Sequence, residues 1–165
     1  MATLIGVRTW PHVVGVWLGF LAVVAVIAVV GSLASVTASE SYTELTLPSW
    51  APPSWVFGPV WTVLYVLIAT AGWQLWRSAG QWRTVQTELS LYAVGPVLNA
   101  VWTPLFFGAG APVAALVDIV LLVVVVAATI VVFARRDGVA ALLLVPYWAW
   151  TAFATALNAA IVVLN

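Results

Sequence analysis

Residues 112–134 of this chain read PVAALVDIVLLVVVVAATIVVFA, with Asp118 as their one charge, and the tetrapeptide RRDG at 135–138 separates them from the uncharged stretch 139–164. A helix needs about 20 apolar residues to cross the hydrocarbon core of a bilayer, so each stretch is long enough for one crossing. Because the connection between them is so short, the two helices should run antiparallel. This pair predicts a membrane protein built from antiparallel helices.

The rest of the chain has the same character. Hydrophobic residues make up 65% of the 165 residues and charged residues 6%, whereas ordinary soluble domains have roughly 45–50% and 25%. Three further uncharged windows lie at 13–38, 54–76 and 89–107, and the polar, proline-rich stretch 39–53 is a loop between the first two. Backbone polar groups must pair within a segment that crosses lipid, so the windows should be helical. We predict an all-α membrane protein with one domain over 1–165, a bundle of five transmembrane helices surrounded by the lipid bilayer.

The arginines predict the orientation of the bundle, because positively charged loops stay in the cytoplasm during insertion. Five crossings place every arginine on the side of the N-terminus, and the opposite side carries Glu40 and Glu44. The arginines are Arg8, Arg77, Arg83, Arg135 and Arg136. We therefore expect a multi-pass protein of the bacterial plasma membrane, rather than the outer membrane, with a cytoplasmic N-terminus and an external C-terminus. A cleaved signal peptide is the less favoured alternative for the first span, because its apolar region exceeds the about 7–15 residues of a signal peptide.

Several classes of site are excluded by composition. The chain has no cysteine and a single histidine, His12, which excludes thiolate sites and multi-histidine metal centres. A formal net charge of zero, without a basic run, gives no electrostatic footprint for nucleic acid. No constellation of nucleophile, base and orienting group is present. We expect no metal site, no required cofactor, no nucleic-acid partner and no hydrolytic or acid–base activity.

Indole and amide side chains within the spans indicate either helix packing or a ligand pocket. Trp61, Trp148 and Trp150 lie too deep in their spans for the interfacial aromatic belt. Asn99 and Asn158 should face the bundle interior, because an unpaired carboxamide in hydrocarbon is costly. Helical spacing gives two stripes, Asn99 with Trp102, and Tyr147 with Trp150, Ala154 and Asn158. These stripes either converge on a pocket or form interhelical hydrogen bonds, and the pattern leaves both readings open.

Asp118 is the one formal charge within a span. An intramembrane carboxylate is a candidate proton relay or cation site. It lies only about two helical turns from the third loop, so a structural role near the membrane interface is the favoured alternative.

Small residues allow helices to approach closely at two places. Gly15 and Gly19 form a GxxxG face, and Ala152, Ala156 and Ala160 form a stripe on the last span. We favour packing within the bundle over a homodimer contact for both.

Several motifs, in order along the chain, resemble those of the tryptophan-rich sensory protein and translocator protein family, also called the peripheral benzodiazepine receptor family. They are LPSWAPPSWVFGPVWTVLY at 47–65, LNAVWTPLFFG at 98–108, ALVD at 115–118, and PYWAW at 146–150 followed by Ala154 and LN at 157–158. The resemblance implies five transmembrane helices around a pocket that opens toward the side of the long first loop and binds porphyrins, haem included, and benzodiazepine-type ligands. It also implies a tendency to form dimers.

The resemblance assigns ligand-binding roles to particular residues. Tyr42 matches a first-loop tyrosine that covers the pocket, and Trp50 lies in the same lid segment. The matching pocket positions are Trp61 and Tyr65 on the second helix, Asn99 and Trp102 on the third, and Trp150 and Ala154 on the fifth; Tyr147 and Asn158 join them through the stripe described above. Trp61 and Trp150 also match tryptophans associated with light-dependent porphyrin breakdown in bacterial relatives.

Two departures from the family pattern reduce the contact expected between the lid segment and the ligand, and argue against sterol binding. Ser41 stands where a tryptophan often precedes the lid tyrosine, and residues 159–165 lack the tyrosine and basic residue of the animal sterol motif. The leading hypothesis is a membrane protein that binds and senses tetrapyrroles or similar flat apolar ligands. The alternatives are photo-oxidative porphyrin degradation and a small transporter that uses Asp118 for coupling.

Overall fold

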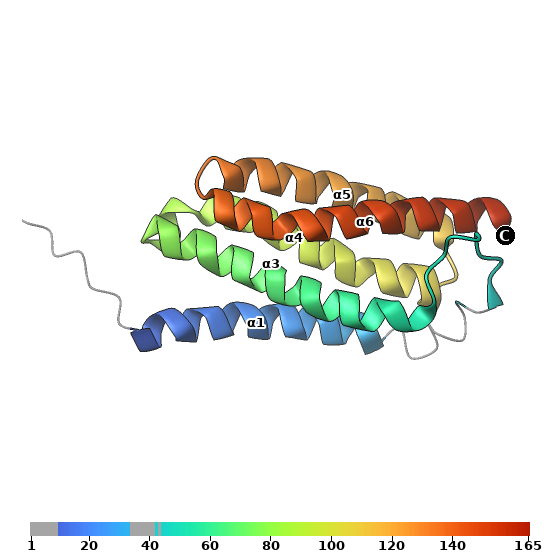
Figure 1. Ribbon diagram of the computed structural model, residues 1–165, viewed down its shortest axis with the longest axis horizontal. Helices are drawn as coiled ribbons and strands as arrows, with labels where there is room; N and C mark the ends of the chain where they lie inside the picture. The colour runs from blue at the N-terminus through green and yellow to red at the C-terminus, as the bar shows by residue number, and fades with distance from the viewer. Residues whose placement is uncertain (1–9, 34–41, 43) are drawn as a thin grey trace, which may run out of the picture.

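The structure, a computed structural model, describes residues 10–33, 42 and 44–165. Five long helices lie side by side along the long axis of the molecule (Figure 1). They are α1 (Trp10–Leu33), α3 (Phe57–Ala79), α4 (Gln86–Thr103), α5 (Pro112–Ala134) and α6 (Gly138–Leu164), with short helical turns at η1 (Ser54–Val56), η2 (Trp82–Thr84) and η3 (Pro104–Gly108). Each of the five is long and apolar enough to cross a membrane, which confirms the predicted all-α bundle of five spans.

The helix bounds differ from the predicted windows mainly where a window ended at a charge. The bounds of α5 coincide with 112–134, whereas α3 continues past residue 76 and ends at Ala79. Arg77 therefore lies on the helix, with its guanidinium carbon 4.7 Å from the centre of the Trp73 ring. A long arginine side chain can leave the hydrocarbon while its backbone stays helical, so a charge need not end a helix. Residues 34–38 of the first predicted span lie outside the described residues.

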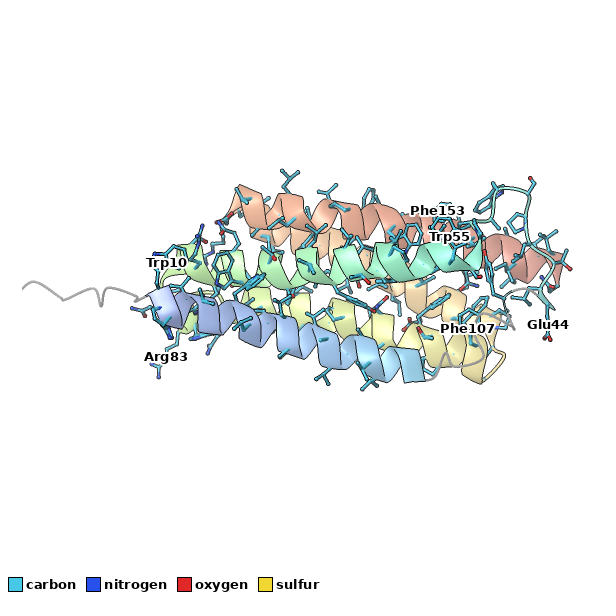
Figure 2. The ribbon with its side chains drawn as sticks, turned by 60° about the horizontal axis from the view of Figure 1, so that its bottom comes forward. Trp10, Glu44, Trp55, Arg83, Phe107 and Phe153 are labelled. Atoms are coloured by element: carbon cyan, nitrogen blue, oxygen red, sulfur yellow. The ribbon has the colours of Figure 1, made fainter. Side chains whose placement is uncertain are left out.

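The described arginines gather at one end of the bundle, which we call the arginine end. Arg77 lies at the end of α3, Arg83 lies before α4, and Arg135 and Arg136 connect α5 to α6. Figure 2 shows Arg83 and Trp10 at this end and Glu44 at the opposite one, which we call the Glu44 end. The segregation follows from antiparallel helices with short connections. The assignment of the arginine end to the cytoplasm stays a prediction, and Arg8 lies outside the described residues.

The Asp137 side chain connects α6 to α3 at the arginine end. Its side chain accepts a hydrogen bond from the backbone amide of Ala140 at 2.9 Å, which caps the N-terminus of α6. It also accepts a hydrogen bond from the amide of Gln74 on α3 at 3.0 Å. Burial alone would raise the pKa of Asp137, but these hydrogen bonds outweigh it and hold the pKa below its ordinary value. Nearby, Arg136 donates to Glu88 at the start of α4 at 2.9 Å.

At the Glu44 end, α4 passes into the wider turn η3. Pro104 has no backbone N–H to donate, and the amide of Ala109 bonds to the carbonyl of Pro104 at 2.8 Å, five residues back. The turn carries Phe106 and Phe107, whose ring centres lie 4.8 Å apart. The widened turn thus places two adjacent aromatic rings beside the interior of the bundle.

Candidate ligand-binding site

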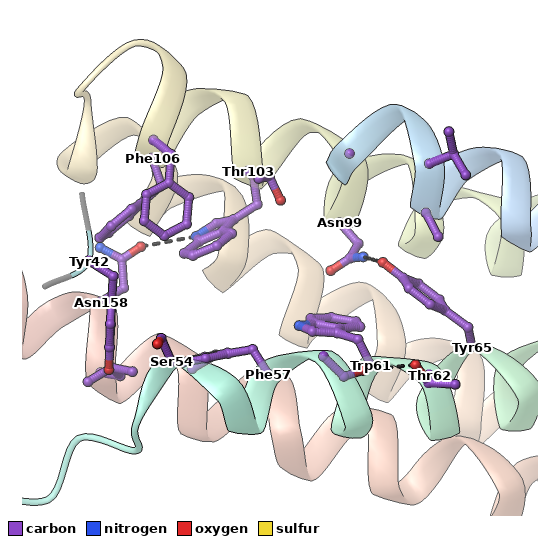
Figure 3. Close-up of a pocket in the computed structure, with 18 of the residues that line it drawn as sticks. Tyr42, Ser54, Phe57, Trp61, Thr62, Tyr65, Asn99, Thr103, Phe106 and Asn158 are labelled. Atoms are coloured by element: carbon purple, nitrogen blue, oxygen red, sulfur yellow. Dashed lines mark hydrogen bonds between the residues drawn. The ribbon is translucent and has the colours of Figure 1, made fainter. Parts of the chain in front are cut away.

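A cavity of about 550 Å³ lies inside the Glu44 half of the bundle (Figure 3). Its walls come from α1, α3, α4, η3 and α6, and Tyr42 of the first loop also lines it. Small-molecule pockets in proteins commonly measure about 300–1,000 Å³ and are mostly apolar with a few placed polar groups. This cavity fits that description.

Two aromatic side chains of α3 form one wall. Trp61 and Tyr65 are one helical turn apart, and their ring centres lie 5.3 Å from each other. The hydroxyl of Tyr65 accepts a hydrogen bond from the amide of Asn99 on α4 at 3.1 Å. The bond holds the tyrosine ring at the cavity wall and gives the buried Asn99 amide nitrogen a partner. Figure 3 shows this pair beside Trp61.

A second interhelical hydrogen bond, between α4 and α6, lies in the cavity wall away from Tyr65. The indole of Trp102 on α4 donates to the side-chain oxygen of Asn158 on α6 at 3.1 Å, and the amide nitrogen of Asn158 donates to the Pro112 carbonyl at 3.0 Å. Trp102 also stacks on Phe106, with ring centres 4.9 Å apart. Asn99 and Asn158 therefore form interhelical hydrogen bonds and line the cavity at once. The interhelical hydrogen bonds of one reading are thus present, and the reading of a ligand pocket stays a prediction.

Tyr42 of the first loop lines the cavity at the Glu44 end. The Tyr42 side chain is 5% exposed, and its hydroxyl donates to the Pro52 carbonyl at 3.1 Å. Four residues further along, Thr46 pairs with Asn165: the Thr46 amide donates to the asparagine oxygen at 2.9 Å, and the asparagine nitrogen donates to the Thr46 carbonyl at 3.1 Å. The described part of the loop is thus bonded both to itself and to the end of the last helix.

Three of the predicted site residues lie outside the cavity wall. Trp50 is half exposed and contacts Phe153, with ring centres 5.7 Å apart. Tyr147 packs behind Trp61 at 6.2 Å, and Trp150 packs behind Phe57 at 5.8 Å, again between ring centres. The Tyr147 hydroxyl and the Trp150 indole nitrogen are buried and have no hydrogen-bond partner among the described residues.

The other seven predicted residues line the cavity: Tyr42, Trp61, Tyr65, Asn99, Trp102, Ala154 and Asn158. The sequence analysis did not name a further set that shares this wall: Ala28, Val29, Gly31, Ser54, Phe57, Gly58, Thr62, Thr103, Phe106, Phe107, Leu157 and Ile161. Helical spacing could have indicated part of this set. Phe57 precedes Trp61 by four residues and Phe106 follows Trp102 by four, so each shares a helical face with a predicted site residue. Whether these side chains bind a ligand stays a prediction.

Asp118 is buried on the inner face of α5 and is not part of the cavity wall. Its Oδ2 atom has no hydrogen-bond partner within the described residues. The structure thus places this carboxyl in the interior of the bundle rather than at its outer surface. Across the described chain, no group of three or more His, Cys, Asp or Glu residues is arranged to hold a metal ion.

Comparison with known proteins identifies the relatives of this chain. Residues 20–164 match the model of the TspO/MBR family. The tryptophan-rich protein TspO of Chlorobaculum tepidum is 44% identical over 128 residues, which cover 78% of this chain and 81% of the relative. The translocator protein of Homo sapiens is 41% identical over 118 residues, covering 71% and 70%. The tryptophan-rich sensory protein of Cereibacter sphaeroides is 36% identical over 142 residues, covering 86% of each chain.

Proposed function

Because the chain belongs to the TspO/MBR family and is a multi-pass membrane protein, we propose that it binds porphyrins, haem included, and related flat apolar ligands in the cavity between its helices. The observation that carries this proposal is the indole wall of the cavity, with Trp61 from α3 and Trp102 from α4. In this proposal the porphyrin is a bound ligand, and the fold does not require it as a cofactor.

The chemistry of the wall suits such a guest. A flat macrocycle gains both apolar burial and ring stacking against indole faces. The two indoles are held in place, Trp102 by its bond to Asn158 and Trp61 by its contact with Tyr65. Propionate groups of a porphyrin would lie toward the polar first loop, where Ser54 lines the cavity and the chain leaves the membrane-spanning segment.

The proposed output is sensing, in which an occupied cavity changes how the first loop is held. Tyr42 belongs both to the cavity wall and to the loop, so a ligand that contacts it would act on the loop directly. We place the protein in the bacterial plasma membrane with the arginine end in the cytoplasm, following the positive-inside rule. A homodimer is part of the proposal only by analogy with the family.

A fluorescence titration tests the proposal. Protoporphyrin IX, haem and a sterol are titrated side by side into detergent-purified protein while tryptophan emission is recorded. We expect quenching by the two tetrapyrroles, and a weaker apparent affinity in Trp61→Phe. Trp148→Phe is the matched control, because Trp148 is 40% exposed and does not line the cavity. Equal titration curves for wild type and Trp61→Phe would reject the pocket assignment.

Light-dependent porphyrin degradation is the second candidate function, favoured by the position of one indole. Trp61 lines the cavity and would contact a bound porphyrin, whereas Trp150 does not line it and contacts the lining residue Phe57. Photo-oxidation of the porphyrin at Trp61, with dissolved dioxygen as the oxidant, is therefore the form of this activity that the geometry supports. Illumination of the protein with protoporphyrin IX should then yield an absorbing product that is absent from empty detergent and reduced in Trp61→Phe.

Coupled transport through Asp118 receives less support from the geometry. A coupling carboxyl should sit beside the substrate, and Asp118 does not line the cavity. Full retention of pH-dependent porphyrin uptake into proteoliposomes by Asp118→Asn would exclude this role.

A further inference from the structure

The arginine end carries more positive side chains than acids that could neutralise them. The structure describes four arginines at this end: Arg77, Arg83, Arg135 and Arg136. The acids described at the same end are Glu88, which is 8% exposed and bonded to Arg136, and Asp137, which caps α6. Four arginines against two acids leave a surplus of two positive charges. Both carboxylates are engaged within the protein, so the surplus must be met from outside it.

Three of these arginines present N–H donors to the outside. Arg83 and Arg135 are exposed, and neither side chain makes a hydrogen bond or an ion pair with another described residue. The side chain of Arg136 is 55% exposed and uses its Nε atom to bond Glu88 at 2.9 Å. A guanidinium has donors on all three nitrogens, so the terminal nitrogens of Arg136 remain available. Arg77 differs from these three, because its guanidinium lies over the Trp73 ring.

The bond between Arg136 and Glu88 joins the two connections that carry these donors. Arg135 and Arg136 lie between α5 and α6, whereas Glu88 lies in the first turn of α4. Arg83 lies three residues before α4 begins, in a connection whose last residue, Val85, is fully buried. The buried valine and the ion pair together hold the two connections against the bundle. The three arginines therefore lie on neighbouring segments whose backbones are fixed.

The same connections are too short to leave the membrane surface. Residues 80–85 connect the spans that end at Ala79 and begin at Gln86, and residues 135–137 connect those that end at Ala134 and begin at Gly138. So few residues reach only a short distance beyond the ends of the helices. The indole of Trp82 is 47% exposed, and indoles of this kind lie at the level of lipid headgroups. Figure 2 shows Arg83 at the outer edge of this end. The arginine donors thus lie at headgroup depth.

Phosphate is the group that suits guanidinium donors at this depth. The planar fork of arginine binds phosphate oxygens in pairs, and each basic residue near an anionic surface strengthens binding by roughly fivefold. A zwitterionic headgroup neutralises its own phosphate, whereas an anionic headgroup such as phosphatidylglycerol does not. A soluble phosphate ion would make the same polar contacts but would have no acyl chains to pack on the exposed apolar faces of the spans. The chemistry therefore favours an anionic phospholipid over a soluble anion.

We propose that the arginine end binds the headgroups of anionic phospholipids through Arg83, Arg135 and Arg136. None of the three lines the cavity, so the inference is independent of the proposed porphyrin binding. A lipid bound there would bridge the α3–α4 connection and the α5–α6 connection. Because such a lipid binds the folded bundle and not the unfolded chain, it would also raise the stability of the bundle.

A lipid titration tests the inference. Protein in a non-ionic detergent is titrated with dioleoylphosphatidylglycerol or dioleoylphosphatidylcholine, which share their acyl chains, and bound lipids are counted by native mass spectrometry. The variants are Arg83→Gln and Arg135→Gln, alone and together. Arg136 is kept, because its loss would leave the buried Glu88 carboxylate without its partner. Glu44→Gln is the matched control, since it also changes the charge by one but lies at the opposite end.

We expect wild type to bind phosphatidylglycerol more tightly than phosphatidylcholine. This preference should fall by about fivefold in each single variant, fall further in the double variant and persist in Glu44→Gln. Equal binding of the two lipids by wild type, or an undiminished preference in the double variant, would overturn the inference.

Two further measurements use wild-type protein alone, so they decide the matter even if a variant fails to fold. Raising the salt concentration to about 0.5 M should remove most of the preference for phosphatidylglycerol, because salt screens exposed charges. A preference that salt leaves unchanged would contradict the role of the arginines. Inorganic phosphate is then added in place of lipid, and we expect it to raise the Tm less than phosphatidylglycerol does. An equal rise would assign the surface to a soluble anion and would also overturn the inference.

Discussion

The indole nitrogen of Trp102 donates to the side-chain oxygen of Asn158 at 3.1 Å, and this bond joins α4 to α6 across one end of the cavity. The same asparagine donates to the Pro112 carbonyl at the start of α5, so a single side chain connects three helices. It is 1% exposed. A buried amide with both of its groups bonded fixes how the helices sit relative to one another.

Removal of this amide should therefore destabilise the bundle. In Asn158→Leu the Trp102 indole and the Pro112 carbonyl both lose a partner, and we expect a loss of about 1–3 kcal/mol, because unpaired buried groups carry most of the cost. Thermal unfolding in detergent measures the loss as a lower Tm. Thr155→Val is the control, since the Thr155 hydroxyl bonds to the Thr151 carbonyl of its own helix and to no other helix that the structure describes. An equal Tm for Asn158→Leu and wild type would contradict the role of the amide.

Two glycines of the helix interior should respond in opposite ways to alanine. A Cβ at Gly72 would lie 2.6 Å from a Phe20 ring carbon and 3.1 Å from Tyr92, whereas a Cβ at Gly95 would lie at ordinary distances, 3.7 Å from Val126 and 3.9 Å from Tyr147. Overpacking costs about 1–3 kcal/mol, but alanine in a helix gains up to about 1 kcal/mol over glycine. We expect Gly72→Ala to lower the Tm, and Gly95→Ala to leave it unchanged or raise it. The reverse order would show that α1 does not pack on α3 as described.

Acid should weaken the α6 cap. The pKa of Asp137 is lower in the folded protein than in the unfolded chain, where it is about 4. Its contribution to stability is therefore present above that value and is lost as the pH falls through the folded pKa. We expect Asp137→Ala to lower the Tm at pH 7, with a cap worth about 1 kcal/mol, and the difference from wild type to shrink below pH 4. A difference that stays constant between pH 7 and pH 3 would contradict the capping role.

The pairing of Thr46 with Asn165 should hold the first loop without adding much to global stability, because both residues are exposed. In Asn165→Ala the Thr46 amide and carbonyl lose these bonds, and we expect faster amide exchange in the peptide that contains residues 44–53, with an unchanged Tm. Hydrogen exchange followed by mass spectrometry measures this. Val163→Ala, a change at a side chain that is 84% exposed, is the control. Exchange that does not differ from wild type would show that the pair does not restrain the loop.

The candidate site was only partly predictable from the sequence. Asn99 and Asn158 are expected to face inward because of their polarity, and Trp102 because it shares a helical face with Asn99; all three line the cavity. Tyr147 and Trp150 do not line the cavity, although each contacts a residue that does, Trp61 and Phe57 respectively. Helical periodicity gives the direction of a side chain but not its neighbours on other helices, so it cannot distinguish a cavity wall from the layer behind it.

The sequence by itself determined the five spans and the gathering of the arginines at one end, because hydropathy and helix length are properties of each segment alone. The tertiary structure decided which inward side chains line the cavity and that α1 contributes Val29 to its wall. These features depend on the distances and rotations between helices, which are set by the packing of side chains from segments far apart in the chain.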